Sequence, residues 1–302
     1  MQQETHLANP NDYENLRLID SCSYVPGPLE HLDLHGSFAL RMHTALWYDL
    51  TIGHRLQSAE DVSIESRRSL FMNKYVAEFI GTFFLVLTIG CTVIGHGAGP
   101  FAPLAIGSAL MAMIFAGGHI SGGHFNPAVT LGVWLRGKCE SKDVAPYMIF
   151  QIMGAVFAAL VVKFLKGGVA VAPLHPATVP ALLAEFLFTF ALVYVVLNVA
   201  TAKGTSGNSF YGLAIGFTVM VGAFSVGNIS GGAFNPAVAT GISVLGLSSW
   251  QNIWIYLVAD FAGAAVAAGA FKALNPAEGV PQPQAQTKAA RAAARQDSYS
   301  HS

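Results

Sequence analysis

The fold of this chain is decided by one stretch that occurs twice, SGGHFNPAV at residues 121–129 and SGGAFNPAV at residues 230–238, 109 positions later. Each copy follows a long apolar run and leads into a short apolar stretch of about 10 residues, which is too short to cross a bilayer. The paired glycines allow the backbone to turn and to approach its neighbours closely. Asn is a good N-cap, and Pro is favoured at the first helical position. Each copy therefore predicts a loop that re-enters the membrane and ends at the N-terminus of a half-helix.

Composition places the chain in a membrane. Of its 302 residues, 53% are hydrophobic and only 11% are charged, whereas soluble domains carry about 25% charged residues. The net charge of −1 gives no reason to expect a nucleic-acid partner. The three cysteines lie far apart and show no metal-ligand spacing. We therefore expect a multi-pass membrane protein with no metal and no cofactor.

The apolar runs predict six spans and two half-helices in two repeats. Spans are expected at about 72–95, 101–119, 143–166, 181–201, 209–228 and 250–273, with half-helices within 121–136 and 230–246. The repeats cover 72–166 and 181–274. Residues 1–71 and 275–302 are polar or Pro- and Ala-rich, and we expect mostly disordered tails. The predicted fold class is an all-α membrane protein with six transmembrane helices plus two re-entrant half-helices.

The repeats are predicted to be inverted. Three full spans in each repeat force the second one to enter the membrane from the opposite side, so the two half-helix N-termini meet at the midplane. Lysines and arginines concentrate in both tails and in the loops after spans two and four. Because positive loops stay inside, both termini are expected to be cytoplasmic. We expect the plasma membrane rather than an internal membrane.

Paired Asn-Pro-Ala boxes, each preceded by Ser-Gly-Gly, resemble those of the major intrinsic proteins, the aquaporins and aquaglyceroporins. The resemblance covers about residues 72–274. It implies an aquaporin-like channel domain, a passive channel rather than an enzyme, and a homotetramer in the lipid bilayer with one pore per subunit.

The boxes are expected to line the pore. A half-helix N-terminus carries unpaired N–H groups and about half a positive charge, so two opposed termini repel cations. Asn amides that donate to a passing water from both sides interrupt the donor chain that proton hopping needs. Alternatively, the Asn residues only cap the half-helices, and the glycines serve only packing. The box residues are Asn126, Pro127, Ala128, Asn235, Pro236 and Ala237, and the expected lumen carbonyls belong to Gly122, Gly123, His124, Gly231 and Ala233.

Ionisable residues within the spans are energetically costly, so each of them calls for a specific role. Glu78 and Glu185 stand at matching positions and are interpreted as acceptors that support the re-entrant loops; a proton relay is the alternative. Asp260 has no counterpart in the first repeat, and a contact between helices is its default interpretation. His119 and His124 flank the first box and are expected to be hydrogen-bonded struts rather than metal ligands.

By resemblance, four residues form the outer constriction, and here they are Ile106, Ala223, Gly232 and Val238. Relatives usually carry Arg where Val238 stands, and glycerol channels place Asp where Ala239 stands. Without the guanidinium, the filter is expected to be wider and more apolar. The predicted solutes are water and small neutral molecules such as glycerol, urea, ammonia or hydrogen peroxide, with protons and ions excluded.

Two other functions stay open at this point. Inverted repeats with broken helices also build secondary transporters, although no cluster of ion-coupling carboxylates is evident. A structural membrane protein with a closed lumen is the other alternative. An enzyme is not expected, because no nucleophile, base and oxyanion set converges in the sequence.

Overall fold

Six helices in the computed structural model are long and apolar enough to cross a membrane, as predicted. The structure describes residues 72–95 and 97–279, so the predicted N-terminal tail and residues 280–302 lie outside the described residues. The candidate spans are Met72–Val93, Gly99–Ser121, Ser141–Leu165, Thr178–Thr201, Tyr211–Ser230 and Trp250–Leu274. The predicted all-α membrane fold is therefore confirmed.

Short helical turns extend several of the spans. The first helix, Met72–Val93, precedes the labelled elements. The α-helices that follow are α2 (Ala102–Ser121), α3 (Pro127–Leu135), α4 (Ser141–Leu165), α5 (Thr178–Val196), α6 (Tyr211–Ser230), α7 (Pro236–Leu245) and α8 (Ile253–Leu274). The shorter turns are η1 (Gly99–Phe101), η2 (Leu197–Thr201), η3 (Lys203–Thr205), η4 (Trp250–Asn252) and η5 (Pro276–Gly279).

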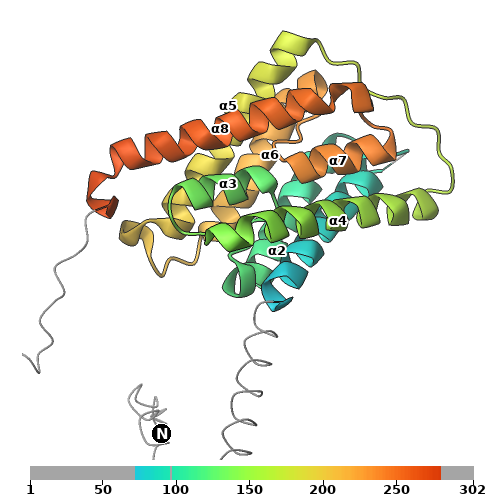
Figure 1. Ribbon diagram of the computed structural model, residues 1–302. Coiled ribbons are helices and arrows are strands. Elements are labelled where there is room, and N and C mark those ends of the chain that lie inside the picture. Colours follow the sequence, from blue (N-terminus) through green and yellow to red (C-terminus); the bar gives the residue numbers. More distant parts are fainter. Residues whose placement is uncertain (1–71, 96, 280–302) are drawn as a thin grey trace, which may run out of the picture. The chain divides into compact units, whose positions relative to one another are not determined.

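The two half-helices, α3 and α7, lie in the interior of the helix bundle. Figure 1 shows them between α4 and α8, and α3 and α7 each contact both of these long helices. Each begins with Pro directly after an Asn N-cap, Asn126 for α3 and Asn235 for α7. Because neither half-helix can span a bilayer, its irregular approach must be covered by protein or border a water-filled space.

Glycines allow the long helices to approach closely at equivalent places in the two repeats. A Cβ added at Gly154 of α4 would lie 2.5 Å from the Phe79 carbonyl oxygen of the first helix. A Cβ added at Gly263 of α8 would lie 2.7 Å from the Phe186 carbonyl oxygen of α5. Small residues at such crossings allow close van der Waals packing, which holds helices together in lipid, where no hydrophobic driving force acts between them.

The helix α2 crosses α6 at the join between the repeats. An added Cβ at Gly107 would lie 2.6 Å from the Gly216 carbonyl oxygen, and one at Gly216 would lie 2.5 Å from the Gly107 carbonyl oxygen. Like the two boxes, this contact pairs a residue of one repeat with its counterpart in the other.

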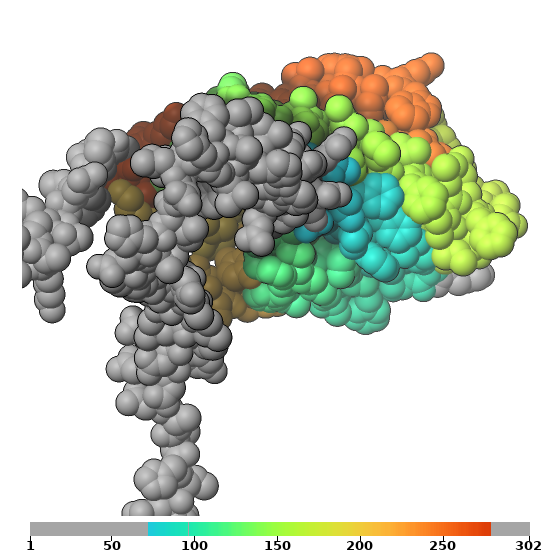
Figure 2. Space-filling model, turned by 60° about the horizontal axis from the view of Figure 1, so that its bottom comes forward, coloured from blue at the N-terminus to red at the C-terminus, as the bar shows by residue number. Residues whose placement is uncertain are grey.

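Large apolar side chains on the outside of the bundle fit a lipid environment. Figure 2 shows the first helix, in blue, between α2 in green and α4 in yellow-green. On α4, Ile149, Met153, Phe157 and Phe164 are all more than half exposed. A soluble protein rarely exposes so large an apolar face, but a span facing lipid must.

Glu278 of η5 ties the end of the described chain to the bundle. Its carboxylate accepts from Arg136 Nη2 at 2.8 Å and from the Lys203 backbone N–H at 2.6 Å. The Arg136 guanidinium also lies 4.7 Å from the centre of the Phe271 ring. The first residues after α8 therefore pack against the C-terminal end of α3.

We predict that Gly263→Ala lowers the melting temperature of the detergent-solubilised protein. The new methyl group meets the backbone of α5, and such overpacking costs about 1–3 kcal/mol. The matched control is Gly269→Ala on the same helix, where an added Cβ meets nothing within 4 Å. That control is expected to melt at or slightly above the wild-type temperature, because Ala favours helix over Gly. Equal melting temperatures for the two variants would contradict this packing account.

Candidate functional site

Both re-entrant loops adopt the same unusual backbone conformation. In the first loop, φ is 89° at Gly122, 64° at Gly123 and 48° at Phe125. The second loop repeats this pattern, with φ of 99° at Gly231, 65° at Gly232 and 48° at Phe234. A bulky side chain at positive φ is rare and persists only where its surroundings hold it. The strain therefore needs a support, and it recurs where each loop enters its half-helix.

Glu78 supplies that support for the first loop. Its Oε1 accepts from Ser121 Oγ at 2.6 Å and from the His124 N–H at 3.0 Å. Its Oε2 accepts from the Phe125 N–H at 2.6 Å and from Gln151 Nε2 at 2.7 Å. The side chain is fully buried. All four partners are donors, so this carboxyl group acts purely as an acceptor.

Glu185 holds the second loop in the same way. Its Oε1 accepts from Ser230 Oγ at 2.6 Å and from the Ala233 N–H at 3.0 Å, and its Oε2 accepts from the Phe234 N–H at 2.6 Å. It too is fully buried. Each repeat thus places one carboxyl group behind its loop, bonded to the residue that carries the positive φ.

Two tyrosines that the sequence reasoning missed also hold the loops. Tyr147 of α4 donates its hydroxyl to the Ser121 carbonyl at 2.8 Å, and Tyr256 of α8 donates to the Ser230 carbonyl at 2.7 Å. The two tyrosines are separated by the same offset as the boxes. That offset is the signal that could have found them.

Asp260 does have a counterpart in the first repeat, contrary to the sequence interpretation. The same offset places it opposite Gln151. Gln151 donates to Glu78 and also to Thr130 Oγ1, at 3.0 Å. Asp260 is buried beside Glu185 and accepts from Thr189 Oγ1 at 3.0 Å. The counterpart was overlooked because Gln and Asp differ in both length and charge.

The two box asparagines meet across the repeats. Asn126 Nδ2 donates to the Phe234 carbonyl at 2.8 Å, and Asn235 Nδ2 donates to the Phe125 carbonyl at 2.9 Å. Each side-chain oxygen also caps its own half-helix, accepting from the N–H of Ala128 or of Ala237. An amide NH2 carries two hydrogens, so the contact between repeats uses one of them in each Asn. The asparagines therefore cap and bridge at once.

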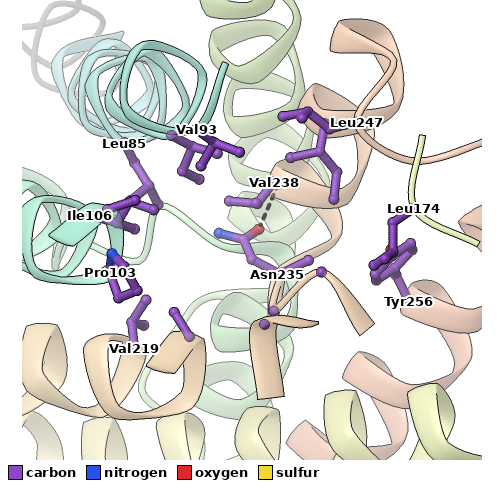
Figure 3. A pocket seen from close by; sticks show the side chains of 18 of the residues that line it. Leu85, Val93, Pro103, Ile106, Leu174, Val219, Asn235, Val238, Leu247 and Tyr256 are labelled. Atoms are coloured by element: carbon purple, nitrogen blue, oxygen red, sulfur yellow. Dashed lines mark hydrogen bonds between the residues drawn. The ribbon is translucent and has the colours of Figure 1, made fainter. Parts of the chain in front are cut away.

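All four residues of the predicted filter lie in the wall of one cavity of about 490 Å³. We call it the Val238 cavity. In Figure 3, Val238 lies directly beside the Asn235 amide, and Ile106, Pro103 and Val219 lie together on one side of it. Within the described part of the chain, no Lys, Arg, Asp or Glu lines this cavity. Its polar side chains are Asn235, Tyr256 and His175.

The segment 172–175 closes one side of the Val238 cavity. Leu174 donates its N–H to the Leu247 carbonyl at 2.9 Å, which fixes this segment against the end of α7. Both Leu174 and His175 line the cavity. This contact could not be predicted from the sequence, because the Pro-rich link before α5 has the pattern of a simple connection.

A second cavity, of about 400 Å³, borders the first loop; we call it the His124 cavity. Gly122 and His124 line it, as do Lys138, Glu140 and Asp143, so it is far more polar than the Val238 cavity. His124 Nδ1 lies 3.1 Å from Thr130 Oγ1 and is therefore a hydrogen-bonded strut. Asn126 borders neither cavity, although Asn235 borders the first one.

Of the expected lumen carbonyls, those of Gly231 and Ala233 belong to residues that line the Val238 cavity, and Gly122 and His124 line the other. Gly123 is buried and lines neither cavity. No group of three or more His, Cys, Asp or Glu residues in the described part of the chain is placed to hold a metal ion. His119 is exposed and lies outside both linings.

We predict that Glu78→Gln destabilises the folded protein. A glutamine offers one acceptor oxygen in place of two and turns an NH2 group toward donors. Each buried donor left unpaired costs about 1–3 kcal/mol. Thermal melting in detergent and the yield of monodisperse protein measure the effect. Glu140→Gln, at an exposed position, is the control. A Glu78→Gln protein as stable as this control would rule out the support role.

Comparison with known proteins identifies the family. The sequence model of the family described as "Major intrinsic protein" matches residues 65–271. The chain is 36% identical to "Aquaporin NIP1-4" of Oryza sativa subsp. japonica, over 68% of this chain and 78% of the rice protein. It is 38% identical to "Glycerol uptake facilitator protein-like 6" of Lactiplantibacillus plantarum, over 65% of this chain and 95% of that protein.

A solved structure shares the fold. The X-ray structure of the aquaglyceroporin from Plasmodium falciparum aligns with a TM-score of 0.59 at 22% identity, over 69% of this chain and 98% of that chain. The six candidate membrane spans and the two re-entrant loops agree with the family match. The chain therefore belongs to the major intrinsic proteins, a family of multi-pass membrane channels, not enzymes, for the passive transport of water and small solutes.

Proposed function

We propose that the pore runs from the Val238 cavity, past the paired boxes, to the His124 cavity, and that it conducts water together with small neutral solutes. This proposal rests on the apolar wall of the Val238 cavity. The wall includes Ile106, Ala223, Gly232 and Val238, and no Lys, Arg, Asp or Glu among the described residues. Such a wall offers a neutral solute space without a fixed charge to bind it.

Val238 is the residue on which the solute range depends. It is buried at the start of α7 and forms part of the cavity wall. A guanidinium at this position would add several donors and a permanent positive charge in the narrow region. With Val, the passage is wider and less polar, which favours solutes the size of glycerol or urea, and equally ammonia and hydrogen peroxide. The printed names of the two relatives, an aquaporin and a glycerol uptake facilitator, support a range that includes both water and glycerol.

Ions and protons are excluded at the boxes. The N-termini of α3 and α7 face one another through Asn126 and Asn235. Both ends carry partial positive charge, so a cation meets an electrostatic barrier and has little to replace its hydration shell. The second N–H of each asparagine amide donates to a passing water oxygen and orients its hydrogens away from the centre.

The orientation and assembly follow from the same reasoning. We propose that both termini are cytoplasmic, because the positively charged loops then lie inside, and that the Val238 cavity opens outward. The protein forms a homotetramer in the plasma membrane, with one pore per subunit. The exposed apolar faces of α2 and α6 supply surface for contact between subunits.

Flux measurements on proteoliposomes test the wide filter. By stopped-flow light scattering, we expect the wild-type protein to speed the passage of water, urea and glycerol over empty vesicles. The flux should stay linear with solute concentration and independent of ion gradients, since a secondary transporter would saturate and follow a gradient. Rejection of both urea and glycerol by a protein that conducts water would contradict the wide-filter proposal, and no flux at all would favour a closed structural protein.

Val238→Arg should narrow the solute range. We expect glycerol and urea flux to fall at least about tenfold while water flux stays within about threefold, because the guanidinium restores bulk and charge at the constriction. Val238→Leu is the matched control, since it adds volume without charge. If Val238→Arg and Val238→Leu reduce glycerol flux equally, size alone sets the selection; if neither reduces it, Val238 does not line the constriction.

A further inference from the structure

The second repeat contains a buried pair of carboxyl groups where the first repeat has a carboxylate and an amide. Glu185 of α5 and Asp260 of α8 are both fully buried and lie within hydrogen-bonding reach of one another. Their counterparts in the first repeat are Glu78 and Gln151. Because an acid replaces the amide here, the hydrogen of this hydrogen bond must come from a carboxyl oxygen instead of an amide nitrogen.

The first repeat shows what the position must provide. Around Glu78, three donors come from the loop, and the fourth is the Gln151 amide nitrogen at 2.7 Å from Oε2. That amide fixes the carboxylate from the side opposite the loop. An amide NH2 donates without changing the charge of the site.

The second repeat lacks a fixed donor at this position. Glu185 receives the same three loop donors as Glu78, from Ser230, Ala233 and Phe234. Asp260 takes the place of Gln151, and its Oδ1 already accepts from Thr189. Its Oδ2 is buried and has no hydrogen-bond partner among the described residues. An ionised Asp260 would therefore set acceptor against acceptor and negative charge against negative charge.

We propose that the Glu185–Asp260 pair holds one proton, which Asp260 carries. The protonated Asp260 then donates a hydrogen bond to the Glu185 carboxylate, as the Gln151 amide does to Glu78. Two carboxyl groups that share a buried site take up a proton for this reason. Asp260 is thus a positioning residue, which acts on the second loop through Glu185. The other groups that face it are the Thr189 hydroxyl, the Asn235 backbone N–H and, farther away, the Tyr256 phenol.

The proton matters for the barrier at the boxes. With it, each repeat keeps a single negative charge behind its loop, Glu78 in one and Glu185 in the other. Without it, a second negative charge would lie beside the N-terminus of α7, where the proposed barrier depends on positive potential. The neutral acid therefore keeps the two half-helix ends electrically alike. This consequence for flux rests on the proposed channel function, whereas the protonation itself does not.

Infrared spectroscopy of the purified, full-length protein at neutral pH tests the protonation directly. We expect a carbonyl stretching band of a protonated carboxylic acid that shifts in D2O and is absent in Asp260→Asn. Gln151→Glu, the mirror change, is expected to add a second such band in the first repeat. A wild-type protein without the band, a band that persists in Asp260→Asn, or no added band in Gln151→Glu would each overturn the proposal.

Flux and stability separate positioning from a merely structural role. Asp260→Asn should keep water flux within about twofold of wild type, because its amide supplies the same donor. Asp260→Leu, which supplies none, should lose flux and melt at a lower temperature. An Asp260→Asn protein as impaired as Asp260→Leu would contradict the equivalence with Gln151. Because the infrared band is read without any solute flux, its loss and a failure of the channel proposal are distinguishable.

Discussion

The structure depends on one reciprocal contact, in which the asparagine amide of each box donates to the carbonyl of the phenylalanine before the other box. Asn126 bonds to Phe234 and Asn235 bonds to Phe125. Each phenylalanine holds the rare positive φ that turns its carbonyl toward the partner repeat. Neither half of the chain can satisfy this contact alone, so the two repeats form one site.

The remaining elements serve to make that contact possible inside a membrane. A half-helix cannot reach across the bilayer, so its exposed backbone ends must be covered by the long helices or border a water-filled space. Glycines such as Gly154 and Gly263 let these helices close around α3 and α7. Glu78 and Glu185 then bind the loop N–H groups that the turn leaves unpaired. Close packing and buried carboxylates are thus two parts of one solution.

The sequence was sufficient to predict the spans, the half-helices and the meeting of the boxes, because these depend on apolar length and on a repeated motif. It was not sufficient for contacts between helices distant in sequence. Tyr147 and Tyr256 look like ordinary span aromatics until their hydroxyls are seen on the loop carbonyls. Asp260 was left without a counterpart because Gln151, which the repeat offset places opposite it, differs from it in both length and charge. His175 lines the Val238 cavity because the Pro-rich link folds against it, and no periodic pattern in the sequence predicts the path of that link.

The most direct test of the central contact is the proton permeability of proteoliposomes, measured with an internal pH indicator and compared with water flux in the same vesicles. If the bridged asparagines form the barrier, Asn126→Ala and Asn235→Ala should each raise the ratio of proton to water permeability, and the double variant should raise it by less than the product of the single effects, since one contact is being removed. A double variant that conducts water and excludes protons as the wild type does would contradict the account.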